Sequence, residues 1–98
     1  QWSNFEQDFM WIKNNTNKHA LIMPDAQCLA YHTNRGTLKG TMENLKDADY
    51  IFVNQNFNLE RRAVVSDEIL KELKTNASNY NKVYENKMTK TSVYKVKK

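Results

Sequence analysis

Cysteine, proline and glycine are scarce in this sequence, whose 98 residues include one Cys, one Pro and two Gly. A single cysteine, Cys28, excludes a disulfide within the chain and a zinc site built from several thiolates. Two glycines are too few for a glycine-rich phosphate loop, and one proline excludes a proline-rich linker. No apolar run approaches the roughly 18 residues of a membrane span, so we expect no part of this chain to cross a bilayer.

The remaining composition is that of a small globular domain. Hydrophobic residues make up 40% of the chain and charged residues 27%. A chain of this length buries roughly two thirds of the surface that its unfolded form exposes, which is enough for one thin core. We therefore predict a single domain over residues 1–98. Because the sequence begins with Gln1 and shows no leader, we expect either that a leader has been removed or that the chain is a piece of a longer protein.

The charge of the chain is uneven along its length. Residues 1–81 hold nine Lys or Arg and ten Asp or Glu, whereas residues 82–98 hold six Lys and one Glu. A nucleic-acid-binding protein usually spreads its cations over one face and uses Arg to read bases, and this chain has only three Arg. We interpret the lysine-rich end as a solubilising, edge-protecting segment or as a surface that faces anionic lipid headgroups.

A first helix is predicted over residues 3–14. Its apolar stripe recurs at helical spacing and consists of Trp2, Phe5, Phe9 and Ile12. We place Asp8 off this stripe, together with Glu6 and Lys13. Ser3 and Asn4 are both candidate N-caps, and Glu6 follows Ser3 at the three-residue spacing of a capping box.

Two short apolar runs predict strands buried inside a sheet. Residues 20–23 are continuously apolar and are followed by Pro24, and residues 50–53 are aromatic and β-branched. The segment between them predicts three shorter elements: a helix over residues 26–32 capped by Asp25, a strand at 37–39, and helical turns from Thr41 to about Asp47.

The second half of the chain predicts a helix and a hairpin. Ser66 is a typical N-cap for a helix that ends near Thr75, with a buried face formed by Ile69, Leu70 and Leu73. Residues 83–86 and 92–96 alternate between their two faces and are separated by about four polar residues, which is typical of an antiparallel hairpin. Residues 55–64 show no clean period and are predicted to be a loop, with or without a short helix.

The order of these elements indicates an α/β fold. We predict a small sandwich of two or three layers built on a mixed sheet of about four to five strands. The front strands are expected to be parallel, since helices connect them, and the last two strands are expected to form a C-terminal antiparallel hairpin.

Residue types that carry chemistry are few. His19 and His32 are the only imidazoles, and a metal held by both would need Asp25 or Cys28 as a third ligand. Cys28 and His32 are four residues apart on one helix, where they lie side by side and do not converge as nucleophile and base. We therefore predict no catalytic residue, no metal site and no cofactor in this chain.

Arg35 stands alone in an arginine-poor stretch, in a predicted turn before Gly36. Its guanidinium either fixes the turn through hydrogen bonds to loop carbonyls or presents a planar fork to an anionic ligand. The sequence alone leaves both interpretations open.

Two tripeptides match the acceptor pattern for N-glycosylation. They begin at Asn14, with Thr16 as the hydroxyl residue, and at Asn76, with Ser78 in the same role. Because asparagine is abundant in this chain, the matches have consequences only if the domain is extracytoplasmic.

Four short stretches together carry a family resemblance. They are Trp11-Ile12-Lys13-Asn14-Asn15-Thr16 with Ala20-Leu21-Ile22-Met23-Pro24-Asp25; Leu29-Ala30-Tyr31-His32-Thr33-Asn34-Arg35; Asp47-Ala48-Asp49-Tyr50-Ile51-Phe52-Val53; and Val83-Tyr84-Glu85-Asn86 with Ser92-Val93-Tyr94-Lys95-Val96. In this order they resemble the soluble carboxy-terminal domain of multi-spanning GT-C class glycosyltransferases, which include the protein mannosyltransferases and oligosaccharyltransferases. The first stretch is similar to the opening that follows the last membrane helix of such proteins, and the third is similar to their central strand.

The resemblance implies a location and a role. The domain would lie on the extracytoplasmic face of a membrane, attached through the chain before Gln1 to the membrane-spanning part of the same polypeptide. Enzymes of this class transfer sugar from a lipid-phosphate donor, and their catalytic acid lies between early membrane helices. The chain alone is therefore not expected to be an enzyme, and its expected role is structural or in contact with a polypeptide or glycan acceptor.

The resemblance also suggests which residues make contacts. The candidate contacts to a ligand or acceptor are Asp25, His32 and Arg35. The candidate contacts to anionic lipid headgroups or to the membrane part are Trp2, Lys95, Lys97 and Lys98. Phe5 and Phe9 are expected to face either the core of the domain or the membrane part.

Two other interpretations remain open. The chain could be a free-standing binding module that contacts nucleic acid or another anionic surface through residues 82–98. It could also be a small enzyme with Cys28 or Arg35 at its site. Salt-dependent nucleic-acid binding would favour the binding module. Thiol-selective inactivation would favour the small enzyme, and hydrophobic spans encoded upstream would favour the domain of a membrane glycosyltransferase.

Overall fold

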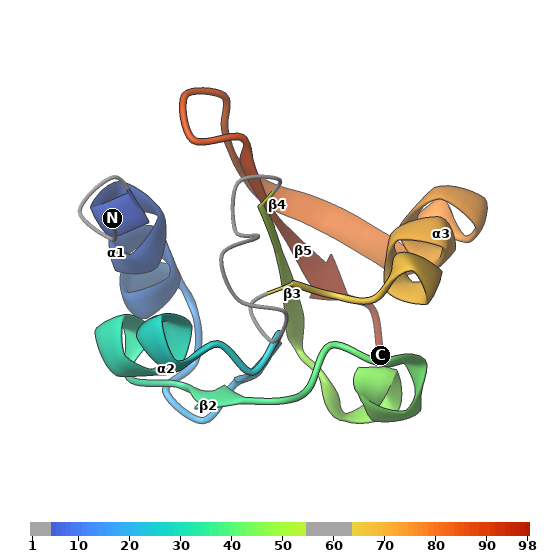
Figure 1. Ribbon diagram of the computed structural model, residues 1–98, viewed down its shortest axis with the longest axis horizontal. Helices are drawn as coiled ribbons and strands as arrows, with labels where there is room; N and C mark the ends of the chain where they lie inside the picture. Colours follow the sequence, from blue (N-terminus) through green and yellow to red (C-terminus); the bar gives the residue numbers. More distant parts are fainter. Residues whose placement is uncertain (1–4, 55–63) are drawn as a thin grey trace.

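The architecture is a five-stranded sheet with helices on both sides (Figure 1). The structure is a computed structural model that describes residues 5–54 and 64–98. Within these ranges the helices are α1 (Glu6–Asn15), α2 (Gln27–Thr33) and α3 (Asp67–Thr75), and the 3₁₀ helices are η2 (Met42–Asp47) and η4 (Ala77–Asn79). The strands are β1 (Leu21–Met23), β2 (Gly36–Thr37), β3 (Tyr50–Asn54), β4 (Tyr80–Asn86) and β5 (Thr91–Val96).

The strands form one mixed sheet in the order β2-β1-β3-β5-β4. β1 pairs in parallel with both β2 and β3, and β5 pairs antiparallel with β3 on one side and with β4 on the other. The predicted α/β class, the parallel front strands and the C-terminal hairpin are confirmed. The strand predicted at residues 37–39 is β2, which begins one residue earlier and ends at Thr37.

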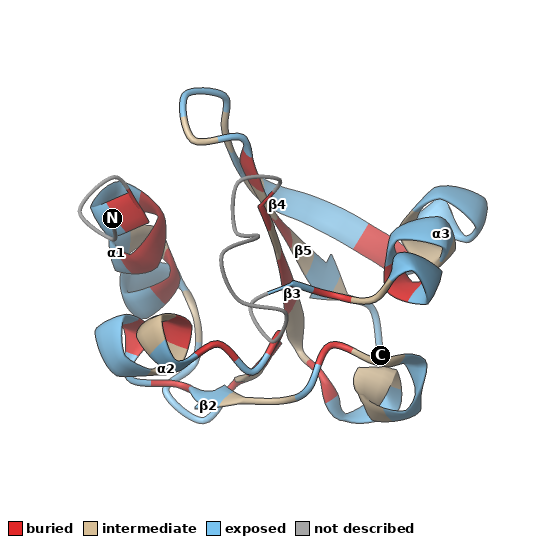
Figure 2. Ribbon diagram, in the orientation of Figure 1, coloured by how far each residue is buried: buried red, intermediate tan, exposed pale blue. Residues whose placement is uncertain are grey.

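The helices divide between the two faces of the sheet and give the domain three layers (Figure 1). α1 and α2 share one core cluster with the strand residues Ile22, Phe52 and Val93. On the other face, residues of α3 and of the loop before it form a second cluster with Met23 and Ile51. Figure 2 shows the buried positions along the strands and on the inward sides of the helices. Burial of a Val, Ile, Met or Phe side chain in these clusters stabilises the fold by about 1.5–3 kcal/mol.

The predicted burial of β1 on both faces is confirmed. Ile22 points into the first cluster and Met23 into the second, and neither side chain is exposed. β1 lies between two parallel neighbours, so its backbone groups are used in the sheet and its side chains alternate between two covered faces.

The predicted helix boundaries agree with the structure more closely than the predicted N-caps do. Ser66 caps α3 as predicted, because its side chain accepts a hydrogen bond of 3.3 Å from the N–H of Ile69. Asp25 does not cap α2, which begins after Ala26 with no side-chain cap. Leu70, predicted on the buried face of α3, is 37% exposed. The predicted N-cap Ser3 lies outside the described residues.

A β-bulge in β4 changes which side chains share a face. Lys82 is paired with Tyr94, and the next pair joins Tyr84 to Val93, so Val83 is the extra residue. Because of this insertion, Tyr84 faces the α1 side of the sheet while Tyr80 faces the α3 side.

The prediction that Asp8 lies off the apolar stripe of the first helix is wrong. Its side chain is fully buried, beside the buried Phe5, Phe9 and Ile12. Positions 5, 8, 9 and 12 follow the i, i+3, i+4, i+7 spacing of one helix face, so Asp8 belongs to the buried stripe. A carboxylate in such a position requires hydrogen-bond donors from elsewhere in the fold.

Candidate functional site

The donors to Asp8 come from the C-terminal hairpin. Oδ1 of Asp8 accepts hydrogen bonds from the hydroxyl of Tyr84 at 2.6 Å and from Nδ2 of Asn86 at 2.9 Å. Its Oδ2 accepts from the hydroxyls of Thr89 at 2.8 Å and Thr91 at 2.9 Å. This Asp8 network joins the first turns of α1 to the residues beside the turn of the hairpin, which are more than seventy residues away from Asp8 in the sequence.

The same network continues to the end of the hairpin, which we call the tip (residues 87–90). Asn54, the last residue of β3, donates to the backbone carbonyl of Thr89 at 2.9 Å and also to the hydroxyl of Thr91. The N–H of Met88 donates to Oδ1 of Asn86 at 3.0 Å. The tip is therefore held at its base by α1 and by β3.

Tyr84 is the titratable partner of Asp8 in this network. Burial raises the pKa of Tyr84 to about 12, and its hydrogen bond to the carboxylate of Asp8 and the negative charge there act in the same direction. The ring of Tyr84 also packs on Trp11, with ring centroids 4.9 Å apart. The phenol is therefore fixed both by packing and by its hydrogen bond.

Arg35, a candidate ligand contact, is buried and bonded inside the fold. Its Nε donates to the hydroxyl of Thr16 at 3.0 Å, and Nη2 donates to the carbonyls of Thr16 and Lys13, both at 2.9 Å. Its Nη1 donates to the carbonyls of Thr33 at 3.1 Å and Asn34 at 3.3 Å. These contacts agree with the interpretation in which Arg35 fixes the turn, and not with the one in which it presents its guanidinium to an anionic ligand.

The position of Arg35 also has an electrostatic reason. Lys13 and Thr16 are at the C-terminal end of α1, and Thr33 and Asn34 are at that of α2. The C-terminal end of a helix carries unpaired carbonyls and a partial negative charge, which a cation stabilises. Arg35 thus serves two helix ends at once.

Asp25, the second candidate contact, lies at the carboxyl edge of the parallel strands. It lines a depression of about 660 Å³ together with Lys39, Gly40, Thr41, Val64, Val65 and Ser66. One oxygen of Asp25 accepts a hydrogen bond of 2.6 Å from the hydroxyl of Thr37. Ligands of open α/β sheets commonly bind at this edge. Of the candidate ligand contacts, the structure places Asp25 in this hollow.

His32, the third candidate contact, is exposed on α2 and stacks on the ring of Phe9, with centroids 5.3 Å apart and planes 3° apart. Cys28 lies one turn before it and packs partly buried against the first core cluster. The structure therefore does not bring His32 into the hollow that Asp25 lines. Among the described residues, no group of three or more His, Cys, Asp or Glu side chains is arranged to hold a metal ion.

The candidate headgroup contacts Lys95, Lys97 and Lys98 lie at the end of the hairpin that is opposite to the tip. Lys95 is in register with Tyr50, the first residue of β3. Lys98 is paired with Asp49, with Nζ and Oδ1 3.1 Å apart. Burial raises the pKa of Asp49, but the N–H of Leu21 and the neighbouring ammonium groups more than offset this, and the net effect is a lowered pKa. Trp2, grouped with these lysines, lies outside the described residues.

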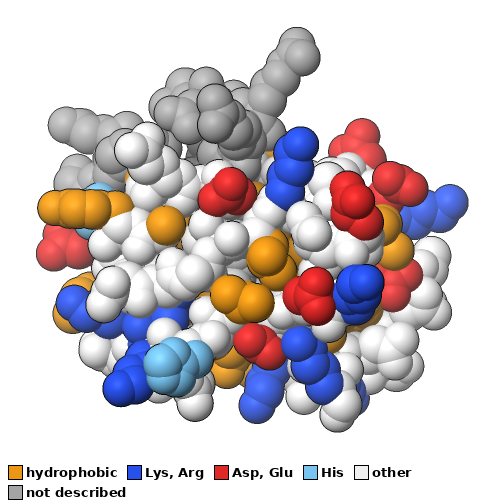
Figure 3. Space-filling view, turned by 90° about the horizontal axis from the view of Figure 1, so that it is seen from below, with side chains coloured by type: hydrophobic (Ala, Val, Ile, Leu, Met, Phe, Trp, Pro, Cys, Tyr) orange, Lys and Arg blue, Asp and Glu red, His pale blue; other side chains and the backbone are white. Residues whose placement is uncertain are grey.

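The lysines of residues 82–98 consequently do not form one patch. Two lie at the tip and three at the opposite end, and Lys82 lies 3.8 Å from the carboxylate of Glu85. On the face shown in Figure 3, acidic and basic side chains lie next to each other. This distribution differs from the continuous basic surface of a typical nucleic-acid-binding domain.

Two further features lie on the surface of the domain. A groove of about 660 Å³ lies between α3 and the hairpin, with Leu73 and Tyr94 among its apolar walls and Lys74 and Lys82 among its polar ones. The candidate glycosylation residues Asn14 and Asn76 are both exposed. Nδ2 of Asn76 donates to Oε1 of Glu72 at 2.9 Å.

No protein family matches this chain, and neither a curated protein nor a solved structure matches it significantly. In the two described ranges, no helix has the length and apolar character of a membrane span.

Proposed function

We propose that this chain is an accessory domain of a larger membrane-embedded glycosyltransferase, attached on the extracytoplasmic face and non-catalytic by itself. Its role there is to support the membrane part and to contact the acceptor. The parent enzyme would transfer sugar from a lipid-phosphate donor, and the catalytic groups would belong to that larger protein.

The main support is the resemblance itself, and hydrogen bonds join three of the four stretches that carry it. Thr16 in the first stretch accepts two hydrogen bonds from Arg35 in the second. The backbone N–H of Leu21 donates to the carboxylate of Asp49 in the third stretch at 2.9 Å, and the N–H of Asp49 donates back to the carbonyl of Leu21 at 2.8 Å.

The contact with an acceptor is assigned to the depression at the carboxyl edge. Asp25 and Lys39 both line it, and no ion pair between them occurs within the described ranges. A carboxylate and an ammonium that remain available can each bind polar groups of an acceptor. Asp25→Asn in the full-length enzyme should raise the KM for the acceptor and leave kcat nearly unchanged, because it alters binding and not the chemical step.

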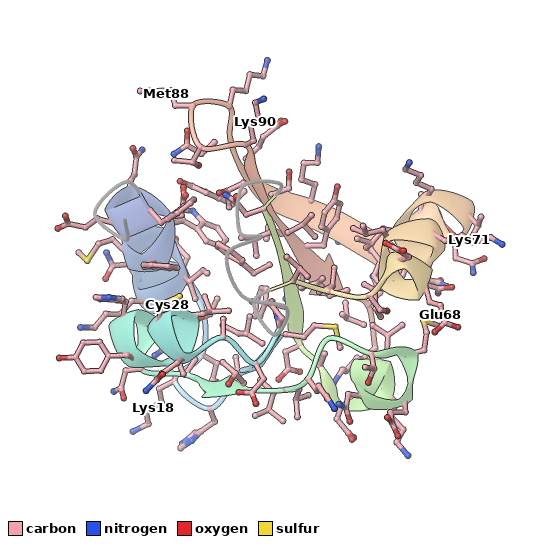
Figure 4. All side chains as sticks on the ribbon, viewed as in Figure 1. Lys18, Cys28, Glu68, Lys71, Met88 and Lys90 are labelled. Atoms are coloured by element: carbon pink, nitrogen blue, oxygen red, sulfur yellow. The ribbon has the colours of Figure 1, made fainter. Side chains whose placement is uncertain are left out.

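The location is tested by labelling the full-length protein in intact cells. Cys28→Ser removes the chain's native thiol, and Lys71→Cys places a new thiol on the exposed side of α3, where the side chain points away from the domain (Figure 4). A membrane-impermeant maleimide should modify this thiol without permeabilisation. The matched control carries Cys28→Ser alone.

Two results would contradict the proposal. One is labelling of the Lys71→Cys protein only after the cells have been permeabilised. The other is an upstream coding sequence that contains no hydrophobic spans.

A further inference from the structure

The tip of the hairpin exposes a large apolar side chain between two cations. Met88 is 92% exposed, the highest value among the large hydrophobic residues of the described ranges. Lys87 and Lys90 flank it and are exposed, and neither forms an ion pair with another described residue. Figure 4 shows Met88 and Lys90 extending from the outermost loop, away from the rest of the domain.

The shape of the tip is held at a cost to the backbone. Lys90 has a φ of 60°, in the left-handed region that residues other than glycine rarely occupy. The Asp8 network fixes the two threonines on either side of Lys90, and Asn86 binds the N–H of Met88. Strained conformations that the surrounding structure enforces are concentrated at functional sites.

We propose that the tip is a membrane-surface contact in which Met88 inserts into the interfacial region of a bilayer and Lys87 and Lys90 bind anionic headgroups. A solvent-exposed apolar side chain with neighbouring cations is the combination that binds such an interface. The proposal rests on the proposed function, which places the domain next to a bilayer. The first turns of α1 lie against the base of the tip, so the tip and the start of α1 are at the same end of the described structure.

This site is distinct from the C-terminal lysines that the sequence suggested. Lys98 is paired with Asp49, whereas the lysines of the tip have no carboxylate partner among the described residues. The C-terminal lysines also lie at the other end of β5, so a flat surface that touches the end of the tip does not reach them.

The test uses the 98-residue chain and two kinds of vesicle, one of mixed phosphatidylglycerol and phosphatidylcholine and one of phosphatidylcholine alone. Co-sedimentation should give stronger binding to the mixed vesicles. Met88→Ser should weaken that binding about tenfold because the apolar contact is lost. Lys87→Gln with Lys90→Gln should weaken it roughly 25-fold, about fivefold for each cation. The matched control, Lys95→Gln with Lys97→Gln, removes the same charge at the opposite end of the hairpin. It should change the logarithm of the vesicle affinity by less than half as much as the substitutions at the tip.

A separate variant keeps the test independent of folding. Lys90→Gly relieves the left-handed strain, so it should raise the urea midpoint while it weakens vesicle binding about fivefold. The proposal is overturned if Met88→Ser binds mixed vesicles as the parent chain does, or if the two lysine pairs weaken binding equally. It is also overturned if an RNA oligonucleotide is bound more tightly than the vesicles and Met88→Ser does not change that binding.

The outcomes separate this inference from the proposed function. Upstream hydrophobic spans together with no vesicle binding would exclude the tip contact alone. Vesicle binding by the tip in a protein that has no upstream spans would exclude the glycosyltransferase assignment alone.

Discussion

At the scale of single residues, polar side chains hold this domain together at positions that are far apart in the sequence. Asp8 binds four donors of the hairpin, and Arg35 binds the ends of two helices. In the described residues, no buried side-chain nitrogen or oxygen lacks a hydrogen-bond partner. Removing one member of such a group leaves its partners unsatisfied, and this costs more than the hydrogen bond itself contributes.

We predict that Asp8→Ala lowers the free energy of unfolding by about 3 kcal/mol. The substitution leaves two threonine hydroxyls, a phenol and an amide without their common acceptor. Urea denaturation followed by circular dichroism measures the change. Glu6→Ala, at an exposed position of the same helix, is the matched control and should change the free energy by less than about 0.5 kcal/mol. Equal effects of the two substitutions would contradict the role of Asp8.

The raised pKa of Tyr84 predicts a loss of stability at alkaline pH. The folded protein holds the phenolic proton more tightly than the unfolded chain, in which tyrosine titrates near its ordinary pKa of about 10. The contribution of Tyr84 is therefore complete below pH 10 and is lost as the pH rises towards about 12, the value in the folded state. Urea midpoints measured across this range should fall less steeply in Tyr84→Phe than in the parent chain. Some fall should remain in the variant, because burial and the carboxylate of Glu72 also raise the pKa of Tyr80. Equal slopes would contradict the assignment.

Arg35→Met should destabilise the domain by about 2 kcal/mol, because carbonyls at the ends of α1 and α2 lose their donor and the nearby positive charge. Thermal unfolding at several salt concentrations measures the loss. Lys18→Met, at an exposed position in the loop after α1, removes the same charge and should be nearly neutral. An Arg35→Lys variant should recover only part of the stability, since an ammonium cannot reach acceptors in so many directions.

At the scale of elements, the sequence predicts the segments that follow simple periodicity. The runs at residues 20–23 and 50–53 are β1 and β3, and Ser66 begins α3. The bulge at Val83 was not predicted, because alternation along one strand does not show how many residues face its partner. Most of the loop predicted between β3 and α3, residues 55–63, lies outside the described part of the chain.

The surroundings of Asp8 and Arg35 were less predictable than the strands and helices, because their partners are distant in the sequence. The spacing of Asp8 relative to Phe5 and Ile12 was visible in the sequence, but the usual polarity of a carboxylate suggested exposure. Its donors belong to a hairpin near the other end of the chain, so no local pattern could indicate them. Arg35 stands out in the sequence as an isolated arginine, but only the fold shows which acceptors surround it.

The cap of α3 provides a prediction at this scale. Ser66→Ala removes the acceptor for the N–H of Ile69 and should cost about 1 kcal/mol. Ser66→Asp retains an acceptor and places a negative charge at the helix N-terminus, so it should be neutral or slightly stabilising. Urea denaturation of the two variants gives the comparison. A loss of stability in Ser66→Asp equal to that in Ser66→Ala would show that the hydroxyl has a role other than capping.

At the scale of the whole molecule, two cores share one sheet. α1 and its Asp8 network lie on one face, and α3 with its Ser66 cap lies on the other. Ile22 and Met23 are neighbours in β1 but belong to different clusters, so loss of either layer exposes one side of the same central strand. This arrangement favours cooperative unfolding of the domain as one unit.

The same arrangement predicts how distant substitutions combine. Asp8→Ala and Ser66→Ala remove contacts on opposite faces that share no hydrogen-bond partner, so the double variant should lose the sum of the two single effects to within about 0.5 kcal/mol. In a Trp2→Phe background, where Trp11 on the α1 face is the remaining tryptophan, fluorescence and far-ultraviolet circular dichroism should report the same urea midpoint in all variants. If the Trp11 signal changes before the circular dichroism in Asp8→Ala, then α1 leaves the sheet before the rest unfolds. In that case the hairpin network, and not the apolar contact of α1, is what joins this layer to the domain.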